Sequence, residues 1–240
     1  MNDAIEVKNL TREYNGFIAL NRFSLRVDWN EKVGLLGPNG AGKTTVLKIL
    51  CGLIRPSSGE AYIDGIDVVR NREQALANIG AIVEAPEFYP FLTPAEILRY
   101  LGRLRGMDEK ELGGEIDRVL RLVGLHRWKN VRVEKFSRGM KQRLALAQAI
   151  LHDPKILILD EPSLGFDPRG MKEIRDLLKR VGKNKTIMLA SHLLTEVEQV
   201  CEKVAVIDHG RLKAYEEIYR LKRKYGSLER AYLKLTGGLI

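Results

Sequence analysis

Short apolar runs alternate with segments of helical periodicity along most of the chain. Runs of this length between helical segments are typical of buried strands, and their alternation predicts an α/β domain with a parallel sheet. The predicted strands are Ile5–Leu10, Phe23–Val27, Lys32–Leu36, Glu60–Ile63, Ile79–Val83, Lys155–Leu159, Thr186–Ala190 and Val204–Asp208. The last strand leads into a predicted hairpin through His209 and Gly210.

The middle of the chain departs from this alternation, because only helical patterns occur from about Thr93 to His152. A capping box begins the segment, with Thr93 as N-cap, Pro94 at N1 and Glu96 at N3. We therefore expect an α-helical subdomain inserted into the α/β core. The expected division of the domain 1–240 is a core of about 1–90 and 153–215, a helical subdomain of about 91–152, and a basic, helical C-terminal tail of about 216–240.

Composition narrows the class of protein. The 240 residues are 45% hydrophobic and 30% charged, which is ordinary for a globular domain. There is no apolar run of about 18 residues, and the N-terminus lacks the layout of a signal peptide. Cys51 and Cys201 lack metal-site spacing and are expected as buried thiols in a reducing compartment. The net charge of +9 fits either an anionic partner or scattered solvated Lys and Arg.

The segment "LLGPNGAGKTT" has the spacing of a phosphate-binding loop, with a strand before it and a helix after it. Glycines let successive backbone N–H groups point at phosphate oxygens, and the helix N-terminus adds its positive end. Lys43 is expected to reach the β- and γ-phosphates, Thr44 to ligate Mg²⁺, and Thr45 to contact the α-phosphate. The loop residues expected to bind the nucleotide are Gly37, Pro38, Asn39, Gly40, Ala41, Gly42, Lys43, Thr44 and Thr45.

Two carboxylates follow a second buried strand in "KILILDEPSLGFDP". Asp160 is expected to bind Mg²⁺ or its water. Glu161 is expected to position or deprotonate the attacking water, if the turn at Pro162 swings it toward the γ-phosphate. His192 follows another strand end, at the sheet edge where ligands bind in such folds, and could donate to a γ-phosphate oxygen.

These motifs, in this order over nearly the whole length, make the chain resemble the ATP-binding cassette (ABC) family of ATPases. The resemblance implies a P-loop NTPase with a RecA-like core, an N-terminal antiparallel β subdomain and the inserted helical subdomain. It also implies a head-to-tail dimer, in which each ATP lies between the phosphate loop of one copy and the signature segment of the other. The cofactors it implies are ATP and Mg²⁺.

The signature candidate is "FSRGMKQRLALAQAI", in which Ser137 and Gly139 match the family pattern and offer donors to a nucleotide. Arg138 and Met140 depart from that pattern. Arg138 either contacts the partner copy's nucleotide or is simply solvated.

The resemblance assigns four further residues. Tyr14 matches the aromatic residue that stacks on adenine, Glu161 the catalytic glutamate and His192 the switch histidine. Asp167, in "SLGFDP", matches a loop residue that faces the opposite phosphate loop. The catalytic set is thus Glu161, His192 and Lys43, and the metal-binding set is Thr44, Glu84 and Asp160.

Glu84 stands where the family usually has Gln, a residue that touches Mg²⁺ or the attacking water. A carboxylate is a good Mg²⁺ ligand, but its charge near the γ-phosphate requires screening, which we expect from Mg²⁺ or Lys43. The segment "VEAPEFYP" and the Met in "GMKQR" are similar to the branch of antibiotic-peptide exporters.

The resemblance implies the ATPase subunit of a transporter, with export as the expected direction. Its permease is a separate chain, contacted by Phe88, Tyr89 and Phe91 unless these pack on their own domain. ATPase subunits form a homodimer or heterodimer at the cytoplasmic face of the membrane, and no nucleic acid is expected. The alternative is a non-transport member that acts on a protein assembly or nucleic acid. A P-loop kinase or GTPase is disfavoured by the signature helix, His192 and the lack of a guanine-reading motif.

Overall fold

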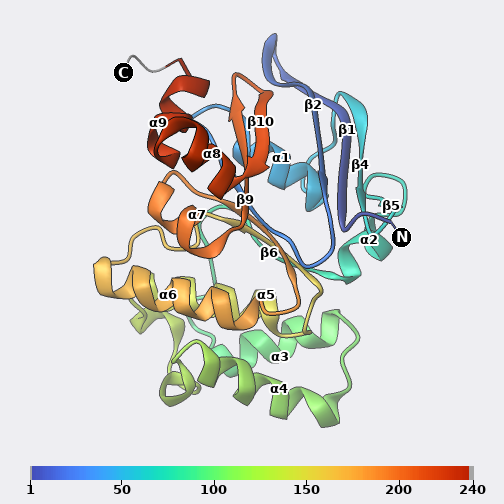
Figure 1. Cartoon of the computed structure of the whole chain (residues 1–240). Helices are drawn as coiled ribbons and strands as arrows, with labels where there is room; N and C mark the ends of the chain where they lie inside the picture. Colours follow the sequence, from blue (N-terminus) through green and yellow to red (C-terminus); the bar gives the residue numbers. More distant parts are fainter. Residues whose placement is uncertain (1, 238–240) are drawn as a thin grey trace.

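The computed structural model describes residues 2–237 as two β-sheets with helices packed around them (Figure 1). The larger sheet has the strand order β10-β9-β3-β8-β7-β6, in which only β10 is antiparallel to its neighbour. The smaller sheet, β2-β1-β4-β5, is antiparallel. The strands are β1 (Ile5–Tyr14), β2 (Phe17–Val27), β3 (Lys32–Leu36), β4 (Ser58–Ile63), β5 (Ile66–Asp67), β6 (Ile79–Ile82), β7 (Ile156–Asp160), β8 (Thr186–Ala190), β9 (Lys203–Asp208) and β10 (Arg211–Glu217). This arrangement confirms the predicted fold class.

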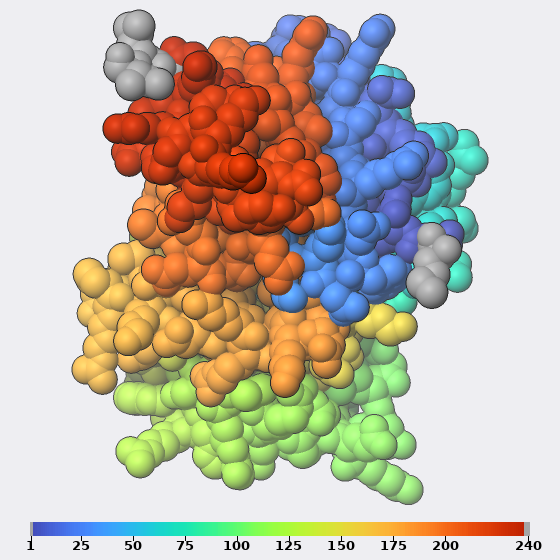
Figure 2. Space-filling view, viewed as in Figure 1, coloured from blue at the N-terminus to red at the C-terminus, as the bar shows by residue number. Residues whose placement is uncertain are grey.

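Helices surround the larger sheet, and only helices occur between β6 and β7, as predicted. The first of these begins with the predicted capping box, in which Thr93 and Glu96 bond each other's backbone N–H. The helices are α1 (Lys43–Leu50), α2 (Arg72–Ala77), α3 (Pro94–Leu104), α4 (Glu109–Leu122), η1 (His126–Trp128), η2 (Val133–Lys135), α5 (Arg138–Ile150), α6 (Pro168–Val181), α7 (Leu194–Val200), α8 (Ile218–Tyr225) and α9 (Leu228–Leu235). Figure 2 shows α3 and α4 at one end of the molecule and the C-terminal helices at the other.

The larger sheet separates two hydrophobic clusters, which explains why β7 is apolar at successive positions. Ile156 and Ile158 pack with the smaller sheet and α1, whereas Leu157 and Leu159 pack with helices α3 to α9. A parallel strand that is buried on both faces reads as a continuous apolar run. The helical segment shares the second cluster with the sheet and so has no separate core.

The first two strands are much longer than predicted. The register of β1 against β2 shifts at Val7, Leu10 and Arg12, and Asn9 and Arg22 adopt positive φ angles. Such irregularities break the two-residue alternation on which the strand prediction rests. The antiparallel pairing nevertheless continues to Tyr14 and Phe17.

The C-terminal part also differs from the prediction at its start. The segment after Arg211 is strand β10, the second arm of the predicted hairpin, and the helices begin only at Ile218. The short elements β5 and α2 were not predicted. Residues 238–240 of the predicted tail, and Met1, lie outside the described residues. No helix of the described residues is long and apolar enough to cross a membrane.

Candidate functional site

The predicted site residues meet because four parallel strands end at one edge of the larger sheet. Strand β8 lies between β3 and β7, and its Ala190 is the register partner of both Leu35 on β3 and Asp160 on β7. On the next strand, Ile82 of β6 is the register partner of Leu159 of β7. The phosphate loop, the two acids, His192 and Glu84 therefore all leave the sheet at its carboxyl edge. This is the edge where α/β sheets bind ligands.

The phosphate loop depends on its glycines. Gly42 has φ 108° at the N-cap of α1, and a Cβ there would lie 2.6 Å from the backbone oxygen of Ala19. A Cβ on Gly37 would lie 2.3 Å from the oxygen of Ile207. Only glycine fits either position, so the loop curls into a cradle of backbone N–H groups.

Lys43 bridges the base of this cradle. Its buried Nζ donates to the carbonyl oxygens of Gly37, at 2.6 Å, and Pro38, at 3.1 Å. Burial lowers the pKa of Lys43, while the charges of Glu161 and Asp160 oppose that shift. The ammonium group is therefore held at the floor of the loop beside the acids.

Thr44 and Asp160 form the other side of the site. The Thr44 hydroxyl donates to Asp160 Oδ2 at 2.8 Å. Burial raises the pKa of Asp160, and the bond from Thr44 acts against that shift. Among residues 2–237 there is no group of three or more His, Cys, Asp or Glu side chains that could hold a metal unaided. A hydroxyl and one or two carboxylates, completed by phosphate oxygens, is instead a typical Mg²⁺ donor set.

Glu161 turns toward His192. Its φ of 48° lies in the left-handed region, so the chain already bends at Glu161 rather than at the predicted Pro162. Oε1 accepts from the His192 backbone N–H at 2.9 Å, and Oε2 lies 2.8 Å from His192 Nδ1. Strained backbone of this kind costs about 1–3 kcal/mol and is concentrated at functional sites.

Glu84 forms an ion pair with Lys48 and not with Lys43. Its carboxylate Oε1 accepts from Lys48 Nζ at 2.5 Å, and no hydrogen bond or ion pair within residues 2–237 joins it to Lys43. Glu84 also has a positive φ, of 65°, and its charge raises the pKa of Asp160. Lys48 lies one helical turn beyond Thr44 on α1, so the two side chains share a face of that helix.

A cavity of about 550 Å³ lies beside the phosphate loop, the two acids and Glu84, whereas His192 is not among the residues that line it. The predicted residues that line it are Tyr14, Asn39, Gly40, Ala41, Gly42, Lys43, Thr44, Thr45, Glu84, Asp160 and Glu161. Tyr14 stands at the rim, and the Arg12 guanidinium carbon lies 4.4 Å from its ring centroid. The volume is within the usual range for small-molecule sites.

Ser137 and Gly139 do not line this cavity. Ser137 is the N-cap of α5, and its hydroxyl accepts from the Met140 N–H at 3.2 Å. Asp167 likewise caps α6. Arg138 does line the cavity and packs over Gly165, where a Cβ would lie 2.8 Å from its Nε. Arg138 is itself exposed, so both alternatives for it stay predictions.

Sequence reasoning missed several residues that contribute to the site. Lys48 could have been found from its helical spacing to Thr44, whereas Lys141, Gln142 and Leu164 reach the cavity only through tertiary packing. Ser191 and Glu196 beneath the site were also missed. Their place at the site was not predicted, because the contact of Ser191 with Glu161 joins residues that are far apart in the sequence.

Comparisons with known proteins agree with this geometry. A family model described as "ABC transporter" matches residues 20–164. The bacitracin transport ATP-binding protein BcrA of Bacillus licheniformis is 41% identical over 230 residues, which cover 94% of this chain and 74% of the relative.

Solved structures are similar over most of their length. One, described as the structure of an ATP binding subunit of an ABC transporter, has a TM-score of 0.88 and 32% identity and covers 97% of this chain and 99% of its own. Another is described as the dimeric structure of a post-hydrolysis state of an ATP-binding cassette bound to ADP and Pi. Its TM-score is 0.81 with 26% identity, and the match covers 89% of this chain and 98% of that one.

Proposed function

The chain belongs to the ABC transporter family, and we propose that it is the motor subunit of an exporter whose permease is a separate chain. As a family member it binds and hydrolyses ATP with Mg²⁺. The residue assignments rest on one observation: the phosphate loop, Asp160 and Glu161 all line one cavity. The assignments below follow from that geometry.

The triphosphate of the substrate binds in the loop cradle. Backbone N–H groups from Gly40 to Thr45 and the N-terminal end of α1 face the phosphates, and Thr45 contacts the α-phosphate. Lys43 exchanges its two carbonyl partners for the β- and γ-phosphates. Tyr14 stacks on the base at the cavity rim.

The donor set on the chain fits Mg²⁺, because the Thr44 hydroxyl and the Asp160 carboxylate already lie within hydrogen-bond distance of each other. Glu84 lines the same cavity, and we assign it as the third oxygen donor. Held by these residues, Mg²⁺ would supply positive charge that offsets the charge of the phosphates.

Glu161 acts as the base for the attacking water, with its carboxylate accepting the proton. His192 holds the carboxylate and donates to the γ-phosphate. A neutral imidazole that donates from Nδ1 to Glu161 carries no proton on Nε2. A ring that carries a single proton therefore releases Glu161 when it turns to the γ-phosphate.

A second ATPase subunit completes the site. Since Ser137 and Gly139 lie outside the cavity of their own chain, we assign them to the nucleotide of the partner subunit. The dimeric post-hydrolysis neighbour supports this arrangement. The partner is either a second copy of this chain or a related ATPase subunit.

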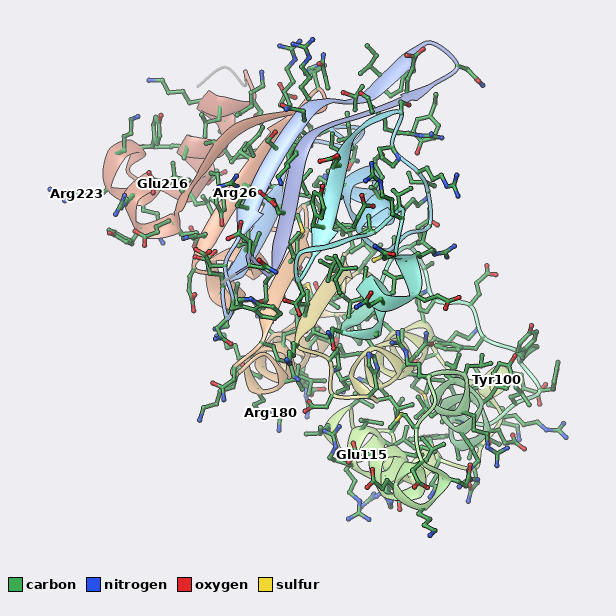
Figure 3. The ribbon with its side chains drawn as sticks, turned by 90° about the vertical axis from the view of Figure 1, so that its right-hand side faces the viewer. Arg26, Tyr100, Glu115, Arg180, Glu216 and Arg223 are labelled. Atoms are coloured by element: carbon green, nitrogen blue, oxygen red, sulfur yellow. The ribbon has the colours of Figure 1, made fainter. Side chains whose placement is uncertain are left out.

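We place the permease contact at the helical subdomain of about 91–152 and the loop before it. Phe88 packs on the core, whereas Tyr89 and Phe91 are 65% and 60% exposed, with ring centroids 5.7 Å apart. Tyr100 of α3 is also exposed, at 56%, and lies at this end of the molecule (Figure 3). The subunit would then bind the cytoplasmic face of the membrane through this surface, while the core of about 1–90 and 153–215 hydrolyses ATP. The described part of the tail, 216–237, lies at the far end.

BcrA is described as a bacitracin transport protein, and we propose export as the direction from the similarity of "VEAPEFYP" to the branch of antibiotic-peptide exporters. The same relative favours transport over the alternative of a protein-assembly or nucleic-acid ATPase. We make no assignment of the transported molecule.

Affinity purification of the tagged chain from membranes, followed by identification of bound chains, tests the proposal. We expect a chain with several apolar spans to co-purify, and to be lost in the Tyr89→Asp/Phe91→Asp variant. Tyr219→Asp is the matched control, because Tyr219 is equally exposed but lies on α8 at the opposite end. Recovery of nucleic acid, or of a partner without apolar spans, would contradict a transport function.

A further inference from the structure

A fully buried carboxyl group lies directly beneath the catalytic edge. Glu196, in the first turn of α7, is 0% exposed, and Ser191 beside it is also 0% exposed. A buried carboxyl group is costly unless it is paired or remains protonated. None of the roles assigned above uses it.

Ser191 links this group to the catalytic carboxylate. Its Oγ lies 2.6 Å from Glu196 Oε2 and 3.4 Å from Glu161 Oε2, and it accepts from the Leu193 backbone N–H at 3.1 Å. A serine hydroxyl has a single proton, so it can donate to only one of the two carboxyl groups at a time. The protonation of Glu196 therefore decides which one receives it.

The surroundings of Glu196 favour the neutral acid. Burial raises the pKa of Glu196 and the charge of Glu161 adds to the shift, although the hydroxyl groups of Ser191 and Ser163 and the charge of Arg175 act against it. Within residues 2–237, Glu196 Oε1 has no hydrogen-bond partner. An unpaired oxygen costs less free energy when the group is a neutral acid than when it is a charged carboxylate. A protonated Glu196 donates to Ser191, and Ser191 then donates to Glu161.

We propose that Ser191 and Glu196 are positioning residues that hold the Glu161 carboxylate through a carboxyl–hydroxyl–carboxylate chain. The inference rests on the proposed role of Glu161 as the base. Its consequence concerns the moment when His192 turns to the γ-phosphate and its ring leaves Oε2. Ser191 then remains on Oε2 and the His192 backbone N–H remains on Oε1, so the carboxylate keeps its orientation toward the water. The 3.4 Å bond is long, as catalytic hydrogen bonds often are before the substrate binds.

The test compares Ser191→Ala with Ser191→Thr in the full chain, by ATPase kinetics and by binding of a fluorescent ATP analogue. Loss of the hydroxyl should lower kcat by about one to two orders of magnitude, because the Glu161 carboxylate is then no longer held in line with the attacking water. KM and nucleotide affinity should change little, and Thr should restore much of kcat. Ser57→Ala is the matched control, since it removes a hydroxyl that accepts from the Glu13 N–H outside the site. Thermal melts of every variant report folding.

A second pair of variants tests the direction of the hydrogen bonds from Glu196 through Ser191 to Glu161. Glu196→Gln keeps a donor toward Ser191 at every pH, whereas Glu196→Leu removes it, so Gln should lose less kcat than Leu. The wild-type kcat should fall as the pH rises through the raised pKa of Glu196, and this fall should be absent in Glu196→Gln.

Two outcomes would overturn the inference: wild-type kcat and pH profile in Ser191→Ala, or equal losses in Glu196→Gln and Glu196→Leu. Failure of the Glu161 assignment is separate, because it would appear as turnover in Glu161→Gln.

Discussion

The Glu84–Lys48 ion pair should compete with Mg²⁺ for the Glu84 carboxylate. In the structure, Lys48 Nζ lies 2.5 Å from Oε1, and the Glu84 side chain is 61% exposed. Water and salt screen a pair with that exposure, and such pairs contribute about 0.2–1 kcal/mol. Releasing Glu84 from Lys48 should therefore shift a Mg²⁺ equilibrium by about 1.4- to 5-fold.

The assay is the Mg²⁺ dependence of nucleotide binding, followed with a fluorescent ATP analogue at low salt. Lys48→Met should lower the Mg²⁺ concentration needed for half-maximal binding, because a free carboxylate is the better ligand. Glu84→Gln should raise it, and in that background Lys48→Met should have no further effect. Lys129→Met is the matched control, since Lys129 forms a similar ion pair with Asp117 away from the site.

Two results would refute this reasoning. A Lys48→Met shift of equal size in the wild-type and Glu84→Gln backgrounds would show that Lys48 acts through some other group. Unchanged Mg²⁺ dependence and turnover in Glu84→Gln would show that the charge at this position has no role in binding the metal ion.

Three further predictions concern single residues. Lys43→Ala should abolish ATP binding in calorimetry, and unchanged affinity would remove Lys43 from the phosphate site. Gly42→Ala should destabilise the fold by about 1–3 kcal/mol in denaturant unfolding and weaken ATP binding, because it places a Cβ 2.6 Å from a backbone oxygen at φ 108°. Burial and the charge of Arg105 lower the pKa of His152 to about 4, below the ordinary value near 6.5. Folding therefore favours the neutral ring. The contribution of His152 to the free energy of unfolding is fully present above about pH 6.5, and up to about 3 kcal/mol is lost as the pH falls toward 4. His152→Gln should lose less stability than the wild type between pH 7 and pH 4.5, and an identical loss would contradict the shift.

The parts of the fold that the sequence predicted well are those with strong local signals. The segment around Gly42 combines an apolar strand, a glycine-rich turn and a helix start, and the strand that ends at Asp160 is apolar on both faces. Each motif also ends a parallel strand, so their meeting at one sheet edge follows from the fold class.

The features that were not predicted from the sequence depend on tertiary contacts. The bulges in β1 shift the alternation at Asn9, so the strand could not be followed past Leu10. The charge of Glu84 was expected to be screened by Mg²⁺ or Lys43, but backbone carbonyls of the loop hold Lys43, and Glu84 pairs with Lys48. Ser191 and Glu196 become recognisable only when the ends of β7 and β8 bring Ser191 beside Glu161.

Turnover and nucleotide binding of Glu161→Gln, measured on the same preparation, test the central claim most directly. The amide keeps the shape of the side chain but cannot accept the proton of the attacking water, and general-base catalysis contributes about 10²- to 10⁴-fold. We predict ATP binding close to that of the wild type, a fall in kcat of at least about 100-fold, and a dimer in light scattering that persists with ATP and Mg²⁺. Wild-type turnover in this variant would contradict the assignment of Glu161 as the base and the account of the site built on it.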